Sequence, residues 1–130
     1  MRKIIDMVVD QQTDGGSSFF EMGRKFGPSL ITGLARMNGH SVGVIGNDCM
    51  FYAGAMTASA AQKLQRFVDF CNSFHLPIVS FIDEPGFMIG PDSEMAGTIR
   101  HGTSAISAVL QSRVPWACVQ VLKAFGVAAQ

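Results

Sequence analysis

The sequence has little charge and no surplus of either sign. Only 15% of its 130 residues are charged, and ten basic residues balance ten acidic ones. Nucleic-acid-binding domains usually carry a basic surplus in a patch, so this composition excludes that class of partner. No apolar run approaches the roughly 20 residues that a membrane span needs, and Met1–Asp6 contains no apolar core of a signal peptide. We therefore expect a cytoplasmic protein without a membrane partner, or a mitochondrial-matrix protein if the source is eukaryotic.

Residues with catalytic or metal-binding side chains are scarce and scattered. Cys49, Cys71 and Cys118 lack the paired spacing of a zinc site or a disulfide framework, so we expect reduced, buried small residues. The three histidines also lack Cys, His or Asp neighbours at ligand spacing, and no metal site is expected. A Walker phosphate loop, a dinucleotide fingerprint and a nucleophile elbow are all missing. The sequence therefore lacks the motifs expected of a kinase, a dehydrogenase or a serine hydrolase.

Apolar residues and glycine are abundant. Nearly half of the residues are hydrophobic (48%), and 14 are glycines, which indicates one globular domain with many tight turns. Low charge beside a positive mean hydropathy also indicates surface that a partner covers. We therefore expect a homo- or hetero-oligomer.

The first half of the sequence predicts a short helix, a loop and a hairpin. Apolar positions suit a helix over residues 2–10, and residues 11–18 have the turn chemistry of a loop. Residues 30–37 and 41–46 are apolar runs joined through Asn38-Gly39, a strong hairpin signal.

The second half predicts helices that alternate with strands. Helical periodicity runs over residues 57–74, with Lys63 and Arg66 expected on its solvated outer face, and Pro77 excludes its continuation. Residues 78–82 and 116–122 are expected to form fully buried parallel strands. A second helix between them is expected to start at a cap on Asp92 or Ser93. Its expected inner face is Met95, Ile99, Ile106 and Leu110. The resulting β-β-α-β-α-β order predicts an α/β fold.

Two buried strands run directly into glycine turns. The turns are Asp83–Gly90, with Pro85, Gly86 and Phe87, and Lys123–Gly126. Ligands of α/β sheets bind at the carboxyl ends of strands, where backbone N–H groups point outward. Each preorganised donor aimed at an oxyanion can supply roughly 3–4 kcal/mol of transition-state stabilisation. The plainer interpretation is that both are ordinary strand-to-helix turns.

The order and spacing of several motifs resemble one family along the whole chain. They are Phe26-Gly27-Pro28, Ile31-Thr32-Gly33, Asp83-x-Pro85-Gly86-Phe87-x-x-Gly90 and Lys123-Ala124-Phe125-Gly126. The chain is similar to the second, C-terminal half of the carboxyltransferase subunits of biotin-dependent acyl-CoA carboxylases, such as the propionyl-CoA and methylcrotonyl-CoA enzymes.

The resemblance implies a crotonase-like fold and a carboxyl transfer. Residues 1–130 would form a single crotonase-like segment with a ββαβαβ core, an incomplete half of a two-domain protein that is truncated at its C-terminus. The implied reaction moves a carboxyl group between carboxybiotin and the α-carbon of an acyl-CoA. The implied partners are the acyl-CoA, a separate biotin carboxyl carrier domain and a first-half carboxyltransferase domain, so the chain alone is expected to be inactive.

The resemblance also implies functional residues. The hole that binds the biotin ureido oxygen would fall on Gly126, Val127 and Ala128. Pro85, Gly86, Phe87 and Gly90 would form the substrate-binding turn. Arg100 and His101 are candidates for contacts with a carboxylate or with the CoA phosphates.

Two other interpretations stay open. A decarboxylase or hydratase of the same superfamily is one of them, and a hydratase would need a carboxylate base, for which Glu84 and Glu94 are the candidates. The other is a truncated, non-catalytic assembly module, which would bind neither biotin nor CoA.

Overall fold

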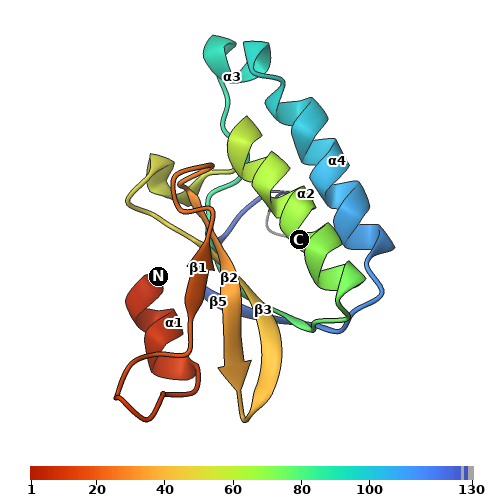
Figure 1. The fold of residues 1–130 in the computed structure, drawn as a ribbon. Helices are drawn as coiled ribbons and strands as arrows, with labels where there is room; N and C mark the ends of the chain where they lie inside the picture. The colour runs from red at the N-terminus through yellow and green to blue at the C-terminus, as the bar shows by residue number, and fades with distance from the viewer. Residues whose placement is uncertain (127, 129–130) are drawn as a thin grey trace.

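A five-stranded mixed sheet forms the centre of the protein, whose computed structural model describes residues 1–126 and 128 (Figure 1). The strand order in the sheet is the chain order, β1-β2-β3-β4-β5. Neighbours are antiparallel from β1 to β3 and parallel from β3 to β5. The elements are α1 (Arg2–Val8), β1 (Phe20–Met22), β2 (Leu30–Met37), β3 (His40–Asn47), η1 (Tyr52–Gly54), α2 (Ala58–Ser73), β4 (Ile78–Glu84), α3 (Pro91–Met95), α4 (Thr98–Gln111) and β5 (Trp116–Ala124).

The predicted hairpin is confirmed. Strands β2 and β3 pair along their full length, and Asn38 and Gly39 both have positive φ values, 51° and 80°, as a two-residue primed turn requires. The Asp10 carboxylate accepts hydrogen bonds from the backbone N–H groups of Asn38 (2.8 Å) and Gly39 (2.7 Å). The chain after α1 therefore fixes the tip of the hairpin.

Helices α2 and α4 pack side by side on one face of the sheet (Figure 1). The Thr57 hydroxyl accepts a hydrogen bond from the N–H of Ala60, so the expected N-terminus of α2 is confirmed. Beneath the helices lies the larger core cluster, which includes Ile45, Phe67 and Ile78. Strands β3 and β4 and the start of β5 therefore lie under the two helices.

Helix α1 covers part of the opposite face of the sheet (Figure 1). Its Ile5, followed by Val9, packs against Ile31 and Phe81 in a second, smaller core cluster. The helix is confirmed but ends at Val8, two residues earlier than expected.

The second predicted helix is two helices, and its inner face was predicted wrongly. Gly97 has a φ of 74° and separates α3 from α4, while Gly90 rather than Asp92 or Ser93 precedes the first turn. The buried residues of α4 are Thr98, Gly102 and Ala105, whose small side chains permit close packing. Of the residues expected inside, Met95, Ile99 and Leu110 are exposed and Ile106 is half-buried.

The last strand is not a fully buried strand. It lies at the edge of the sheet, and residues 117–120 are exposed because no described element covers them. Cys118 is among them, and Cys49 is half-buried, so only Cys71 satisfies the expectation of a buried thiol. In β4 the fully buried residues are Ile78, Phe81 and Glu84, and the others are half-buried.

Lys63 does not lie on a solvated face of α2, as the sequence led us to expect. Only 6% of its surface is exposed, and its ammonium donates a 2.6 Å hydrogen bond to the backbone carbonyl of Leu30. Desolvation lowers the pKa of Lys63, although the nearby Glu21 opposes that shift. Arg66, three residues later, is exposed as expected.

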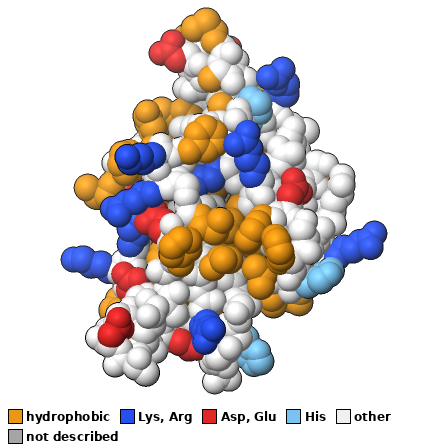
Figure 2. Space-filling view, viewed as in Figure 1, with side chains coloured by type: hydrophobic (Ala, Val, Ile, Leu, Met, Phe, Trp, Pro, Cys, Tyr) orange, Lys and Arg blue, Asp and Glu red, His pale blue; other side chains and the backbone are white. Residues whose placement is uncertain are grey.

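Apolar side chains gather on the face shown in Figure 2, where α2 crosses the β1–β2 end of the sheet. Phe20 and Phe74 are largely exposed, and Phe74 packs on Phe70, with ring centroids 4.8 Å apart. Among the described helices, none combines the length and apolar character needed to cross a membrane.

Candidate functional site

The carboxyl ends of β3, β4 and β5 meet at one edge of the sheet, because these three strands are parallel. Asn47 ends β3, Glu84 ends β4 and Ala124 ends β5. The segment after η1 joins them, since the N–H of Met56 donates to the carbonyl of Gly86 at 2.9 Å. Both glycine turns of the sequence therefore lie at this edge.

The two glycine turns are in direct contact. A Cβ atom built on Gly126 would lie 3.8 Å from the Cα of Gly86, and one built on Gly86 would lie 3.5 Å from the carbonyl oxygen of Phe125. The φ values of Gly86 (121°) and Gly126 (69°) lie in the region that favours glycine. The N–H of Phe125 donates to the carbonyl of Glu84 at 3.1 Å and holds the turns together.

Backbone donors in both turns lack acceptors within the described part of the chain. The N–H groups of Gly86, Phe87 and Gly126 make no hydrogen bond to any described residue. Gly86 is buried, although Pro85 before it is exposed. Buried N–H groups are normally satisfied, so the Gly86 donor, like that of the exposed Gly126, is open to a bound oxygen atom as far as the described residues go.

A cluster of three polar side chains ties the ends of β4 and β5 together. Asp83 Oδ1 lies 3.3 Å from Lys123 Nζ, and Asp83 Oδ2 accepts a hydrogen bond from the Cys49 thiol at 2.9 Å. Burial opposes ionisation of Asp83, but hydrogen bonds from Cys49 and Lys123 leave the pKa of Asp83 below its usual value. Burial and the bond to Asp83 raise the pKa of Cys49. The thiol is therefore a donor to a carboxylate and not an activated nucleophile.

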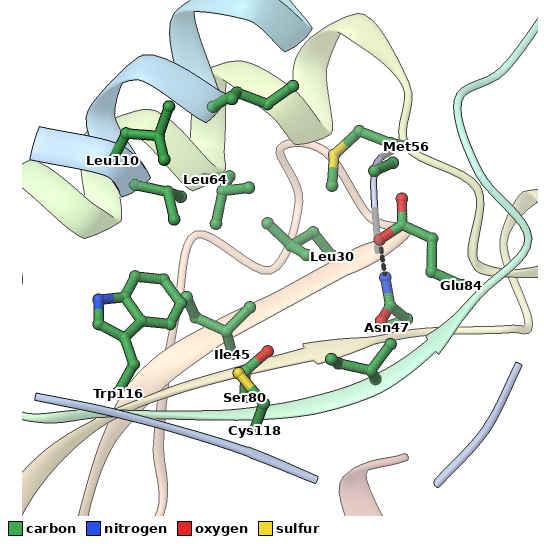
Figure 3. A pocket seen from close by; sticks show the side chains of 14 residues that line it. Leu30, Ile45, Asn47, Met56, Leu64, Ser80, Glu84, Leu110, Trp116 and Cys118 are labelled. Atoms are coloured by element: carbon green, nitrogen blue, oxygen red, sulfur yellow. Dashed lines mark hydrogen bonds between the residues drawn. The ribbon is translucent and has the colours of Figure 1, made fainter. Parts of the chain in front are cut away.

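An apolar cavity of about 390 Å³ lies between the sheet and the helices, below these turns. Figure 3 shows Leu110 and Trp116 at one end of it and Asn47 and Glu84 at the other. Ala128, a predicted site residue, lines the cavity as well. The volume suits a small ligand or an apolar group of a larger one.

Glu84 is the buried acid of this cavity. Only 4% of its surface is exposed; Oε2 accepts a 3.3 Å hydrogen bond from the Asn47 amide, and Oε1 has no partner among the described residues. Desolvation raises the pKa of Glu84 to about 8, which the bond from Asn47 only partly offsets. The carboxyl group is therefore largely protonated at neutral pH and is a donor rather than a base.

The remaining predicted residues lie around the start of α4. The Phe87 ring packs against Gly102, where an added Cβ would lie 2.5 Å from a ring carbon, and Gly90 precedes α3 with a φ of 115°. His101 Nε2 lies 2.9 Å from the Gln62 amide nitrogen of α2, and the exposed Arg100 lines a polar hollow between α2 and α4. His101 thus contacts α2, whereas Arg100 only lines the hollow beside it, and the predicted contacts of both residues with a carboxylate or phosphates remain predictions.

Sequence reasoning missed some residues of the site. Asn47 is one, because its amide joins Glu84 to the carbonyl of Gly54 while its Oδ1 accepts the N–H of Asp83. Its position directly after an apolar strand was the available signal. Val127, which was predicted to contribute a donor, lies outside the described residues. No group of three metal-ligating side chains occurs in the described ranges 1–126 and 128.

Comparison with known proteins decides which family the arrangement belongs to. The profile of the carboxyl transferase domain matches residues 1–130. The chain belongs to the carboxyl transferase domain family. It is 41% identical over 126 residues to an uncharacterized carboxylase, YngE, of Bacillus subtilis, a match covering 97% of this chain and 24% of the relative. It is 38% identical over 126 residues to the mitochondrial propionyl-CoA carboxylase beta chain of Homo sapiens, covering 97% of this chain and 22% of the relative.

Solved carboxyl transferase structures have the same fold. A transcarboxylase 12S structure, described as a hexamer assembly with methylmalonyl-coenzyme A bound, superposes with a TM-score of 0.90 at 35% identity and covers 98% of this chain and 24% of that one. A single-chain long-chain acyl-CoA carboxylase superposes with a TM-score of 0.93 at 32% identity, covering 99% of this chain and 13% of that one. The chain thus spans about a quarter or less of the length of these relatives. The predicted α/β carboxyltransferase fold is confirmed.

Proposed function

We propose that this chain provides one side of a carboxyltransferase site, at which a carboxyl group moves between carboxybiotin and the α-carbon of an acyl-CoA. The contact between the Gly86 and Gly126 turns, whose N–H groups have no acceptor among the described residues, carries the proposal. Membership of the carboxyl transferase domain family supports it. Two donors in adjacent turns suit an oxyanion because they need no rearrangement when charge develops.

The proposed roles of the residues are those that the family resemblance implies. The N–H of Gly126, with the backbone of Val127 and Ala128, would donate to the ureido oxygen of biotin and stabilise the negative charge on it. The turn of Pro85, Gly86, Phe87 and Gly90 would hold the acyl thioester. The N–C bond of carboxybiotin would break and a C–C bond to the α-carbon would form, while the α-proton would pass to the ureido nitrogen that loses the carboxyl group, so no side-chain nucleophile is required. In this proposal no side chain has to act first as a base and then as an acid.

Further domains complete the proposed site. The biotin would arrive on a separate carrier domain, and a first-half carboxyltransferase domain would supply the other side. The largely exposed Phe20 and Phe74 support an assembly in which a partner covers apolar surface. The isolated chain should therefore bind ligands weakly and should not turn over in a carboxylation assay with free biotin and short acyl-CoAs.

Calorimetric titration of the chain with free biotin tests the proposal. The variant Gly126→Ala adds a methyl group at a φ of 69°, beside Gly86. The matched control is Gly39→Ala, which strains a φ of 80° in the hairpin turn with no heavy atom within 4 Å. We expect Gly126→Ala to weaken biotin binding about tenfold or more and Gly39→Ala to leave it unchanged. Equal affinity of both variants, or no binding of biotin by the unaltered chain, would reject the proposed biotin side.

The buried carboxyl group of Glu84 bears on the alternative of a hydratase. A hydratase base must be ionised, whereas burial raises the pKa of Glu84 to about 8. Exposed Glu94 is the other candidate. Hydration of an enoyl-CoA that Glu94→Gln abolishes without unfolding would favour that alternative. A non-catalytic module would bind neither biotin nor acyl-CoA in the same titrations.

A further inference from the structure

The pairing of β4 with β5 is irregular at one place. Ile82 pairs with Gln120, but the next pair is Glu84 with Ala124. Between these pairs β4 has the single residue Asp83, whereas β5 has three residues, 121–123. The last strand therefore contains a bulge of two extra residues, directly before the second glycine turn.

Asp83 contacts this bulge through one carboxylate oxygen and the loop after β3 through the other. Oδ1 accepts the backbone N–H of Lys123 at 3.2 Å and lies 3.3 Å from the ammonium group of the same residue. Oδ2 accepts a 2.9 Å hydrogen bond from the Cys49 thiol, and the backbone N–H of Asp83 donates a 3.1 Å hydrogen bond to Asn47 Oδ1. A bulge leaves strand N–H groups without ladder partners, and the Asp83 carboxylate satisfies the one on Lys123.

The Lys123 side chain reinforces the same link. Its ammonium also donates to the carbonyl of Ala53 at 3.3 Å, in the segment with positive φ values that follows β3. The carboxylate of Asp83 thus connects the ends of β4 and β5 to the loop after β3.

The bulge decides where the second glycine turn lies. With regular pairing, Leu122 would lie opposite Glu84. Gly126 would then lie two residues beyond its present position along the strand direction, about 7 Å past Gly86 at the rise of a strand. The bulge removes that offset, so Gly126 comes into contact with Gly86.

We propose that Asp83 is a positioning residue: its carboxylate holds the bulge of β5 and thereby places the Gly126 N–H beside the Gly86 turn. The functional role of Asp83 in this proposal rests on the proposed carboxyl transfer. The positioning itself rests only on the contacts between β4 and β5. Asp83 itself touches neither the carboxyl group nor the acyl-CoA in this proposal.

Nuclear magnetic resonance of the whole chain tests the geometry. In the unaltered chain, we expect a nuclear Overhauser effect between the α protons of Gly86 and Gly126. Asp83→Asn keeps an acceptor oxygen and should retain the effect, whereas Asp83→Ala should lose it. Lys123→Met is the matched control, because it removes the ammonium group but keeps the backbone N–H, and it should also retain the effect. A retained effect in Asp83→Ala would overturn the proposal.

Biotin titration of the same variants tests the purpose. We expect Asp83→Ala to weaken binding about tenfold, and Asp83→Asn and Lys123→Met to stay within about threefold. Rescue by Asn separates positioning from a general loss of stability. If the unaltered chain binds no biotin, the proposed function fails while the proton contacts still decide the positioning role.

A measurement on the unaltered chain covers the case in which Asp83→Ala does not fold. When Asp83 is protonated by lowering the pH, the amide protons of Lys123 and Gly126 should shift with the same midpoint as the Asp83 carboxyl carbon. A Gly126 amide that does not follow this titration would overturn the proposal.

Discussion

The Asn47 amide donates a 3.3 Å hydrogen bond to Glu84 Oε2, and this is the one polar contact of the Glu84 carboxyl group among the described residues. The other oxygen lies buried beside an apolar cavity, with no partner in the described part of the chain. One weak donor does not compensate the desolvation of a carboxylate, so the folded protein holds the neutral acid.

Glu84 should therefore make the protein less stable as the pH rises. Its pKa is about 8 in the folded state and 4.5 as the ordinary value, so the folded state binds the extra proton between these limits. The stabilisation is complete below about pH 4.5 and is lost as the pH rises through 8. Each unit of difference between the two pKa values corresponds to about 1.4 kcal/mol, so the free energy of unfolding changes by a few kcal/mol over this pH range.

Urea unfolding of Glu84→Gln at pH 5, 7 and 9 checks this expectation, because glutamine stays neutral throughout. The free energy of unfolding of Glu84→Gln should exceed that of the unaltered chain by roughly 2 kcal/mol or more at pH 9. The control Glu94→Gln changes an exposed carboxylate and should follow the unaltered chain. Equal pH slopes for all three proteins would contradict the assignment.

Removal of the buried Lys63 side chain should destabilise the fold. Lys63→Ala deletes the 2.6 Å hydrogen bond to the Leu30 carbonyl together with the packing of a buried stem. The expected loss in free energy of unfolding is about 2–3 kcal/mol. Arg66→Ala, on the exposed side of the same helix, should cost no more than about 0.5–1 kcal/mol. Thermal and urea denaturation measure both, and an equal cost would show that burial of Lys63 contributes nothing.

The contact between Gly102 and Phe87 should tolerate no added methyl group. In Gly102→Ala the new Cβ would lie 2.5 Å from the Phe87 ring, so the ring or α4 must move. Overpacking of this kind costs about 1–3 kcal/mol and outweighs the better helix propensity of alanine. The ring resonances of Phe87 should shift, and the melting temperature should fall. Thr103→Ala changes the exposed neighbour and should have neither effect.

Short stretches of sequence correctly predicted the elements that depend only on neighbouring residues. The Asn38-Gly39 turn, the helix that starts near Thr57 and the strand after Pro77 all came from short-range rules and are confirmed. The two glycine turns were also identified from the sequence itself, and the family resemblance predicted the carboxyltransferase fold.

The failures concern burial, which depends on residues far away in the sequence. Lys63 looks solvated along its helix, but its side chain is buried and its ammonium bonds to the Leu30 carbonyl at the start of β2. Leu110 looks like a core residue but is 80% exposed, beside a cavity that no described element fills. The Asp83–Lys123 link needs a two-residue irregularity in strand pairing, which no periodicity in the sequence marks.

The order of the strands has a consequence for how the protein is made. Because the order in the sheet is the order in the chain, each strand that leaves the ribosome can join the edge formed by the one before it. The hairpin of β2 and β3 can form early, whereas β5 can join the sheet only after the other four strands have been made. Gly126 cannot reach Gly86 until then, so among the described elements the proposed site would be the last to assemble.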